Sequence, residues 1–161
     1  MENQQQACVN KHRVALYIRS NQAETVPNAN STEIQMINLK AQCQQEGKEI
    51  VEIYIDEGVS GTDWGQLHSL NRLLREAKEG KFDEVKVYDL SRISRKSIDL
   101  LEVASFLGKH KIALYTIAER LDTTSPMGLF ALQMMAAIRE FDPTRAEATV
   151  LINKWGDGNN A

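Results

Sequence analysis

The sequence predicts an α/β fold of three layers, in which a mainly parallel sheet is flanked by helices. Short runs of β-branched and aromatic residues alternate along the chain with longer stretches of helical periodicity. Turn residues, most often glycine, separate these segments. The 161 residues suit one domain, and a composition of 42% hydrophobic and 25% charged residues is ordinary for a globular protein. Such alternation is typical of a parallel sheet covered by helices.

The first half of the chain predicts a strand, a helix and a second strand. Residues 14–18 are the first strand, and the polar loop 22–30 follows. Asn30 and Glu33 have the spacing of a capping box, so we expect a helix that starts there and ends at Gly47. Its apolar side is built on Ile34, Ile37 and Ala41, widened by Met36, Leu39 and Cys43. Residues 49–55 are rich in β-branched side chains and predict the second strand, which ends in Asp56.

The second half repeats the alternation. An amphipathic helix closed by Gly80 comes first, with Leu67, Leu70, Leu74 and Ala77 on its apolar side. Residues 85–88 predict a short strand. A helix closed by Gly108 follows, and residues 112–117 predict another strand.

The last helix is expected to start near Ser125-Pro126 and to stop before Pro143. Proline removes an internal hydrogen bond and clashes with the preceding turn. We expect the methionines of this helix, Met127, Met134 and Met135, to pack in the core.

The domain organisation follows from these elements. Residues 1–12 read as a flexible leader, 13–142 as the folded domain and 143–161 as a short tail. The tail is too short for a helix-turn-helix module, so we expect no DNA-binding module in it. No apolar run approaches the ~18 residues of a membrane span. No signal peptide is recognisable, and two cysteines form no disulfide framework, so we expect a cytoplasmic protein.

The charge limits the partners. The net charge is −3 and the pI is about 5.7, which is not the footprint of a domain that holds nucleic acid by charge alone. A role on DNA therefore requires a local basic site or a separate binding module, and we expect DNA binding by this chain alone to be weak.

Polar side chains gather where the first two predicted strands end. In open α/β sheets, ligands and chemistry sit at the carboxyl ends of the strands. The first strand end offers four candidates: Tyr17, Arg19, Ser20 and Asn21. The second offers Asp56 and, in the loop that follows, Ser60.

The third strand end carries two arginines, Arg92 and Arg95, in the sequence Y-D-L-S-R-I-S-R. Side chains at i and i+3 on a helix point the same way. A phosphate is the natural occupant between two guanidiniums, because the planar fork of arginine matches it. The three histidines are scattered, and there is no glycine-rich phosphate loop. Arginines with a serine, and no metal or cofactor, suit nucleophilic attack on a phosphate diester.

The motifs resemble those of the serine recombinases, the resolvases and invertases, in their catalytic domain. The likeness is collinear from about Arg13 to Asp142. The matching segments are R-V-A-L-Y-I-R (13–19), S-T-E-I-Q (31–35), Y-I-D-E-G-V-S-G-T (54–62), F-D-E-V-K-V-Y-D-L-S-R-I-S-R (82–95) and L-D-T-T-S-P-M-G-L-F (121–130). Several matched motifs in the right order make a strong signal.

This resemblance implies a mechanism and a set of site residues. In the family, a serine hydroxyl attacks a DNA phosphate to form a 5′-phosphoserine link, and arginines stabilise the developing charge. Two dimers pair, cut, rotate and rejoin the strands, without metal or nucleotide. The likeness thus implies DNA recombination or integration, often within a mobile element. By position, the resemblance assigns the family's active-site neighbourhood to Tyr17, Arg19, Gln35, Asp56, Ser60, Arg92 and Arg95.

The chain departs from the family pattern at the nucleophile. Where the family reads Y-x-R-V-S, this chain reads Y-I-R-S-N, so Asn21 occupies the nucleophile position. Ser20 stands one residue early, and a shift of one residue in a strand turns a side chain to the other face. Two hypotheses remain open. Either Ser20 is a displaced nucleophile that a bend at the strand end brings to the phosphate, or the chain is a catalytically degenerate domain kept as an interaction module or a mobile-element remnant.

Two further departures concern arginines that the family carries. One usually follows S-G-T, where this chain has Gln66 nearby; the other follows E-F-E in the final helix, where this chain has Pro143. The final helix is the family's dimer arm, so we expect a homodimer or tetramer to be weakened here.

Some residues allow a plainer interpretation. Arg92 and Arg95 could be surface arginines paired with Asp89 or Asp99, and Asp56 could cap the next loop. Trp64 is either an exposed loop aromatic or a plug over the site. We expect His68 and His110 to be solvated helix residues.

Overall fold

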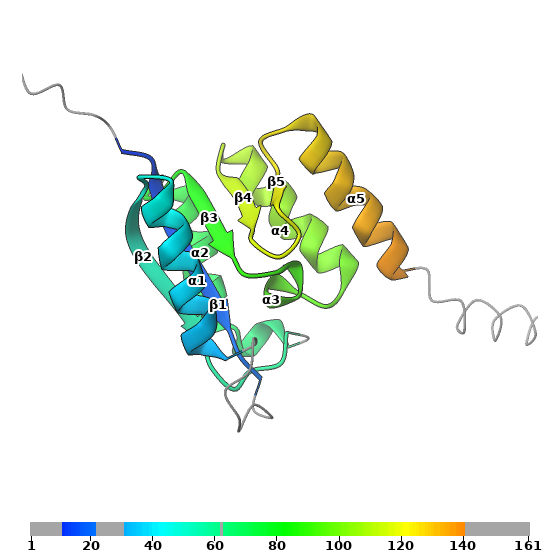
Figure 1. Cartoon of the computed structure of the whole chain (residues 1–161). Coiled ribbons are helices and arrows are strands. Elements are labelled where there is room, and N and C mark those ends of the chain that lie inside the picture. Colours follow the sequence, from blue (N-terminus) through cyan, green and yellow to red (C-terminus); the bar gives the residue numbers. More distant parts are fainter. Residues whose placement is uncertain (1–10, 22–30, 62, 141–161) are drawn as a thin grey trace, which may run out of the picture.

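The computed structural model describes residues 11–21, 31–61 and 63–140, and it confirms the predicted α/β class (Figure 1). One five-stranded sheet runs in the order β2-β1-β3-β4-β5. Its strands are β1 (Arg13–Arg19), β2 (Glu49–Asp56), β3 (Glu84–Val87), β4 (Ala113–Thr116) and β5 (Leu121–Asp122). The first four are parallel, and the short β5, which the sequence did not predict, is antiparallel to β4.

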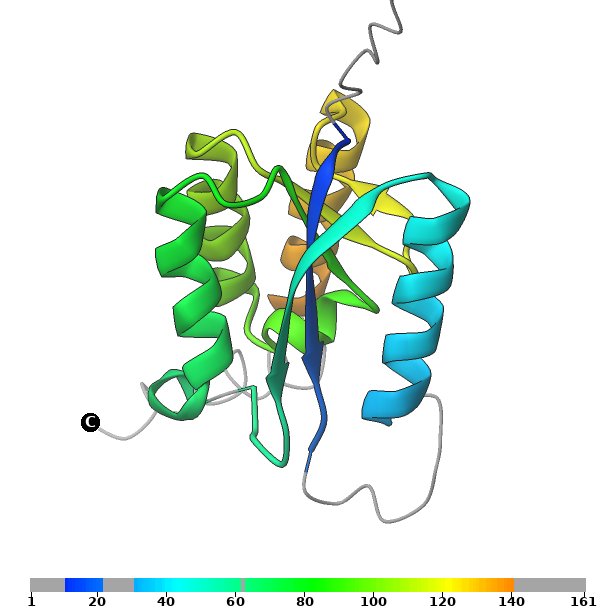
Figure 2. The same ribbon diagram turned by 90° about the vertical axis from the view of Figure 1, so that its left-hand side faces the viewer.

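The helices form a layer on each face of the sheet (Figure 2). They are α1 (Thr32–Gln45), α2 (His68–Lys78), α3 (Leu90–Ile93), α4 (Ser97–Lys109) and α5 (Pro126–Glu140), with a 3-10 turn, η1, at Trp64–Gln66. The helix α1 covers one face, and α2 and α4 cover the other. The helix α5 packs against α4 and β5, outside the second layer. None of the helices in the described ranges has the length and apolarity to cross a membrane.

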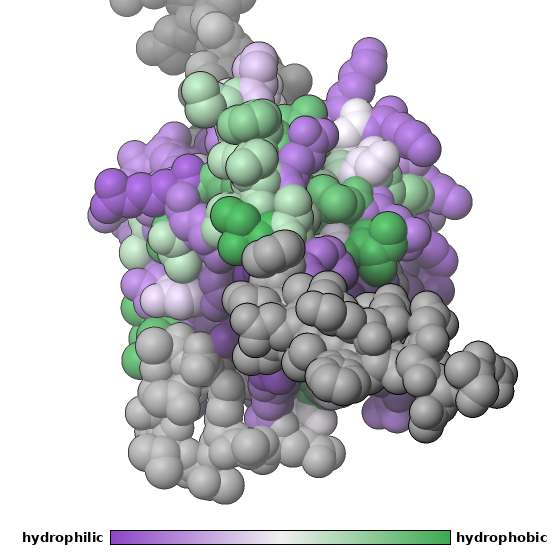
Figure 3. Space-filling view, turned by 90° about the vertical axis from the view of Figure 1, so that its right-hand side faces the viewer, coloured by the Kyte–Doolittle hydropathy of each residue, from purple (hydrophilic) through white to green (hydrophobic). Residues whose placement is uncertain are grey.

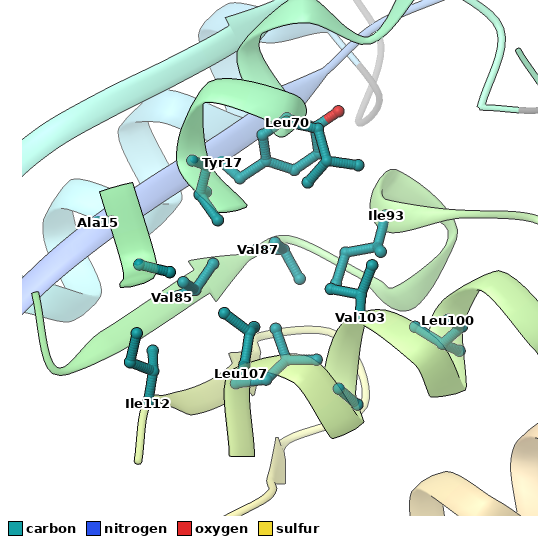
Figure 4. Packing of buried hydrophobic residues seen from close by; sticks show 14 of the residues in the cluster. Ala15, Tyr17, Leu70, Val85, Val87, Ile93, Leu100, Val103, Leu107 and Ile112 are labelled. Carbon is teal, nitrogen blue, oxygen red and sulfur yellow. The ribbon is translucent and has the colours of Figure 1, made fainter. Parts of the chain in front are cut away.

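The strand β1 lies at the centre of the core because it is buried on both faces. Val14, Leu16 and Ile18 face α1, whereas Ala15 and Tyr17 face α2 and α4. This alternation is the period of two that a strand requires. Figure 4 shows the larger cluster, in which side chains of β1 and β3 meet those of α2 and α4. A parallel sheet covered on both faces reads as a continuous apolar run, as residues 14–18 do.

The helix α1 differs from its prediction in both cap and buried face. Its N-cap is Ser31, whose Oγ accepts a hydrogen bond from the backbone N of Ile34 at 3.4 Å, so the predicted capping box on Asn30 is wrong. The buried residues are Gln35, Leu39 and Cys43, whereas Ile34 and Ile37 are 36% and 66% exposed. Ala41 is exposed as well. Leu39 and Cys43 are thus buried as predicted, and Met36 packs against the same cluster. Ile34, Ile37 and Ala41 instead face solvent, because the buried amide of Gln35 donates to Arg19 O at 3.0 Å and takes the inward position.

The glycines confirm two of the predicted helix ends and correct a third. Gly47 and Gly80 follow α1 and α2 with φ of 65° and 68°, a left-handed conformation that glycine adopts without steric cost. Gly108 instead lies inside α4, which runs on to Lys109. Lys111, with φ of 59°, makes the turn into β4.

The helix α5 packs through a narrow face, and this makes part of the core prediction wrong. Its buried residues are Gly128, Leu132 and Ala136, one every four positions. Met127 and Met134 are 74% and 47% exposed, so they do not pack in the core, whereas Met135 is partly buried against it. A Cβ on Gly128 would lie 1.8 Å from Asp122 O, which explains the close approach of α5 to β5. The predicted stop before Pro143, like the tail 143–161, lies outside the described residues.

Candidate functional site

Arg19 ends β1 and is 1% exposed. Its Nε donates to Arg92 O at 2.9 Å, its Nη2 to Ser91 O at 2.7 Å, and its Nη1 to Val59 O at 2.9 Å and Asn21 Oδ1 at 2.6 Å. All four acceptors are neutral oxygens, so no carboxylate bonds to Arg19 in these contacts, and the nearby charge of Asp89 offsets its burial only in part. Burial lowers the pKa of Arg19, and the positive charge of Arg92 nearby lowers it further. A buried guanidinium of this kind favours an anion beside it.

Arg92 lies against the same residue from the α3 side. It is 5% exposed, and its Nη1 donates to Arg19 O at 2.9 Å. Its Nε also pairs with Asp89 Oδ2 at 3.2 Å, so the expected pairing is correct, but Arg92 is buried and is not a surface arginine. Asp89 is the N-cap of α3. Arg92 is therefore fixed in place by structure on both sides.

Arg95 is exposed and does not share a helix with Arg92. The helix α3 ends at Ile93, and Ser94 is extended with φ of −155° and ψ of 152°. The predicted alignment of the two arginines on one helical turn is wrong because the turn is broken between them. Both charges still act on Arg19, since each lowers its pKa.

The loop after β2 lies directly on Arg19. Gly61 is buried, and a Cβ on it would lie 2.9 Å from Cζ and Nη2 of Arg19. Ser94 Oγ donates to Gly61 O at 3.4 Å and to Asp99 Oδ2 at 3.0 Å. The indole Nε1 of Trp64 donates to the same carboxylate oxygen at 2.8 Å. Asp99 thus joins this loop to the segment that carries Arg95.

The contacts of Trp64 and Asp99 bear on two open questions from the sequence, the role of Trp64 and a pairing of Asp99 with an arginine. Trp64 is partly buried against the core, and its Nε1 is bonded to Asp99, so it anchors its loop. Asp99 accepts from Trp64 and Ser94, and no ion pair between Asp99 and an arginine is present in the described ranges. The sequence analysis did not single out Gly61, Ser94 or Thr32, although each lies within one of the matching motifs.

Ser20 and Asn21 point to opposite sides. Ser20 is 7% exposed, and its Oγ accepts from Thr32 Oγ1 of α1 at 3.1 Å. Asn21 accepts from the guanidinium of Arg19. The backbone stays bonded as in a sheet here, because Ser20 N donates to Asp56 O at 3.1 Å. The structure thus brings Asn21, and not Ser20, beside the arginines.

Asp56, 5% exposed, is a structural cap. Its carboxylate accepts from Tyr17 OH at 3.0 Å and from the backbone N of Ser69 and Leu70 at 2.9 and 3.0 Å, at the start of α2. Burial, together with the Asp56 charge, raises the pKa of Tyr17 well above its usual range. The plainer interpretation of Asp56 as a cap holds, but Asp56 caps the start of α2 and not the next loop. Ser60 is exposed in the loop after β2.

The predicted candidates therefore fall into two groups. Arg19, Arg92 and Asn21 meet at the carboxyl ends of the strands, with Gln35 behind them and Arg95 at the surface. Tyr17 and Asp56 connect β1 to α2. The described ranges hold no group of three or more His, Cys, Asp or Glu side chains that could bind a metal. His68 and His110 are exposed, as predicted. The first group can hold a phosphate or a similar anion.

Comparison with known proteins adds a family to this geometry. Residues 14–150 match the family model described as the resolvase N-terminal domain. A protein of Bacillus subtilis (strain 168) described as a candidate DNA recombinase is 31% identical over 132 residues, which covers 82% of this chain and 25% of that protein. The Tn917 transposon resolvase of Enterococcus faecalis is 29% identical over 113 residues, 69% of this chain and 56% of the resolvase. This chain thus spans no more than about half the length of these curated relatives.

Solved structures agree with the sequence comparison. The crystal structure of the N-terminal catalytic domain of TP901-1 integrase superposes with a TM-score of 0.68 at 30% identity. The match covers 80% of this chain and 95% of that domain. The likeness therefore extends over nearly all of a catalytic domain.

Proposed function

The chain belongs to the resolvase family, through its N-terminal domain, and on this premise we propose that it is the catalytic domain of a serine site-specific recombinase. Its substrate is then DNA, cut and rejoined at a specific site. The observation that carries the proposal is the buried Arg19, whose four hydrogen bonds all go to neutral oxygens. A phosphodiester supplies the negative charge that this arginine lacks. We also propose a cytoplasmic protein from a mobile element, and the likeness to a transposon resolvase supports that origin.

The proposed reaction is a transesterification. A serine oxygen forms a bond to phosphorus, and the bond from phosphorus to the 3′ oxygen of the DNA breaks. The serine proton ends on the released 3′ hydroxyl, and the 5′ end stays attached to the protein. Arg19, Arg92 and Arg95 stabilise the charge that develops on the phosphate oxygens, usually the largest contribution in such chemistry. The reverse reaction, with a new 3′ hydroxyl, joins the exchanged strands.

We assign the attacking hydroxyl to Ser20. It neighbours Arg19, and it directly follows the last residue of β1. To reach a phosphate beside Arg19, Ser20 has to leave its hydrogen bond to Thr32 and exchange places with Asn21. The assignments of Gln35, Tyr17 and Asp56 follow from their contacts, and that of Ser60 from its position in the family motif. Gln35 fixes the backbone of Arg19, Tyr17 and Asp56 hold β1 to α2, and Ser60 contacts the phosphate from its loop.

A covalent-trap assay tests this proposal. The purified chain is mixed with supercoiled and nicked DNA carrying candidate sites, quenched in denaturant, and examined for protein joined to a 5′ end. We expect an adduct that Ser20→Ala abolishes, that Ser60→Ala slows without abolishing, and that Lys40→Ala on α1 leaves unchanged. No adduct from the wild type, but one from Asn21→Ser, would overturn the assignment of Ser20 and indicate an intact pocket around a lost nucleophile. No adduct from either chain would contradict the enzymatic proposal.

We further propose that a second copy of the chain docks on α5. Five large apolar side chains of this helix are exposed: Met127, Leu129, Phe130, Met134 and Ile138. Figure 3 shows apolar surface on the side of the molecule where α5 lies. An apolar hollow of about 760 Å³ between α4 and α5 adjoins it. Phe130→Asp should shift the chain from dimer to monomer in light scattering, whereas Lys40→Asp on α1 should not. A wild-type chain that is monomeric at high concentration would contradict this proposal.

A further inference from the structure

A second group of cations lies apart from the arginine site, in a groove between α2 and α4. The groove has a volume of about 480 Å³, and its lining residues are His68, Asn71, Leu74, Arg75, Lys78 and Phe106. Three of these side chains carry positive charge or can acquire it, and none is a carboxylate. This local excess is notable in a chain of net charge −3. The excess stops along α4, where Glu102 and Lys109 line the adjoining hollow together.

The cations of the groove differ from two neighbouring cations, Arg72 on α2 and Lys81 just after it. Arg72 pairs with Glu52 and Glu76, at 3.6 and 3.9 Å, and Lys81 pairs with Glu76 at 3.4 Å. Arg75 and Lys78 are exposed, and neither has an ion pair among the residues that the structure describes. The carboxylate of Glu76 is engaged on the other side of α2, where Tyr54 donates to it. The charge of the groove is therefore available to a partner.

The floor of the groove is aromatic. Lys78 Nζ lies 5.7 Å from the centroid of the Phe106 ring, and the His110 ring lies 4.7 Å from the same centroid. A cation held over an aromatic face keeps its position without losing its charge. Sugar rings and bases offer apolar faces to such a ring, whereas a simple inorganic anion does not.

The groove starts at the end of the molecule that carries the arginine site. The helix α2 begins at His68, and its first turn is capped by Asp56 at the carboxyl end of β2. From His68 to Lys78 the helix rises about 15 Å, at 1.5 Å per residue. The distance exceeds the spacing of successive phosphates on a DNA strand, so one strand leaving the arginine site can contact the groove at more than one phosphate.

We propose that the groove between α2 and α4 binds the sugar-phosphate backbone of DNA beside the cleavage site. This inference rests on the proposed function, because it takes DNA as the substrate. Arg75 and Lys78 contact phosphates, and Phe106 packs against a sugar or base of the same strand. The contact carries no base readout, so it adds affinity without adding sequence preference.

Salt dependence of DNA binding tests the groove directly. The affinity of the full chain for a fluorescein-labelled duplex of 30 base pairs is measured by anisotropy over a series of salt concentrations. Removal of a single phosphate contact lowers the slope of log K against log salt by about 0.9. Arg75→Gln/Lys78→Gln should therefore lower the slope by about 1.8. The matched control is Arg72→Gln/Lys81→Gln, which removes the same charge from paired cations near the same helix and should leave the slope unchanged.

The outcomes separate this proposal from the proposed function. An equal decrease of slope in both double variants would overturn the proposal that the groove binds DNA, because the decrease would then reflect net charge alone. Wild-type binding that neither double variant changes, or no wild-type binding at low salt, would overturn it as well. If binding depends on Arg75 and Lys78 while the covalent-trap assay gives no adduct, the groove stands and the enzymatic proposal fails. Thermal unfolding of each variant verifies that the fold is retained.

Discussion

Two buried cations on the same sheet, Arg19 and Lys86, are treated in opposite ways. Lys86 in β3 is fully buried, and its Nζ lies 2.9 Å from a carboxylate oxygen of Glu46 and 3.0 Å from one of Glu84. Its ammonium also lies 3.9 Å from the centroid of the Tyr115 ring. Arg19 is as deeply buried, but its guanidinium donates hydrogen bonds only to neutral oxygens.

The difference separates a structural charge from a functional one. Around Lys86, carboxylates and cations balance, since Lys48 joins both Glu46 and Glu84 and His12 approaches Glu84 at 3.1 Å. An ion network of this kind fixes the end of α1 on the sheet and leaves nothing for a ligand. Around Arg19 the protein supplies hydrogen bonds without a matching charge, so an incoming anion completes the site.

The largest expected effect is a loss of stability when the ion network around Lys86 is broken. Lys86→Met removes the fully buried cation of this network and leaves the carboxylates of Glu46 and Glu84 to share Lys48, so the free energy of unfolding should fall by about 3 to 5 kcal/mol. Urea denaturation measures it. Lys48→Met, at a side chain that is 25% exposed, should cost about 1 kcal/mol or less. Similar decreases for the two variants would contradict the expectation that the fully buried Lys86 contributes more to stability than the partly exposed Lys48.

The second prediction concerns Arg95, at the surface of the arginine site around Arg19. Arg95→Gln removes an exposed charge, so cleavage should slow by about 100- to 1000-fold. The free energy of unfolding should stay within about 0.5 kcal/mol of the wild type. Single-turnover adduct formation and urea denaturation give the two values, with Lys40→Gln on α1 as the matched surface control. A variant that unfolds more easily but reacts normally would mean that Arg95 is structural.

The third prediction concerns the approach of Gly61 to Arg19. A methyl group here would lie 2.9 Å from the guanidinium, so Gly61→Ala must move Arg19 or the loop. We expect a loss of stability of about 1 to 3 kcal/mol and a rate of adduct formation lower by at least about tenfold. Gly108→Ala is the control, because nothing lies within 4 Å of the added methyl and α4 should gain about 0.5 to 1 kcal/mol. Equal behaviour of the two would exclude a positioning role for Gly61.

The smallest expected effect is a pH dependence of stability that arises from Glu46 in the ion network around Lys86. Burial would raise the pKa of Glu46, but hydrogen bonds from Lys48 and Lys86 outweigh it and lower the pKa from 4.5 to about 2. Because the folded-state pKa is depressed, this contribution to stability is present above pH 4.5 and is lost as the pH falls towards 2. Glu46→Gln should reduce the acid-induced loss of stability in denaturation curves from pH 6 to 2. An unchanged pH profile would refute the assignment.

The sequence predicted the order of elements well and the inward faces of the outer helices poorly. Residues 14–18 are apolar at every position, so β1 was readable, and its carboxyl end was correctly expected to carry polar residues. The helix α1 was misjudged because Gln35, a polar residue, is buried to hold the backbone of Arg19. Met127 and Met134 of α5 were misjudged because the buried residues of this helix are Gly128, Leu132 and Ala136, with Met135 only partly buried beside them.

The site was predicted by residue type but not by arrangement. Arg19 and Arg92 were recognised, yet their contacts run through backbone oxygens, which no residue pattern encodes. The link from Trp64 through Asp99 to Ser94 joins segments 30 residues or more apart, so it exists only in the folded chain. Lys86 stood in an apolar strand with no sign that Glu46, 40 positions earlier, would neutralise it.

The outer edge of β2 has a consequence for solubility. This strand of eight residues ends the sheet, and no other strand of the described chain pairs with its far side. Val51 and Ile55 are exposed on it, which would invite another chain to add a strand and start aggregation. Glu49 and Glu52 interrupt that apolar pattern with negative charge. Copies of the chain should therefore repel one another at this edge, and replacement of Glu52 by valine would turn it into a nucleus for insoluble assemblies.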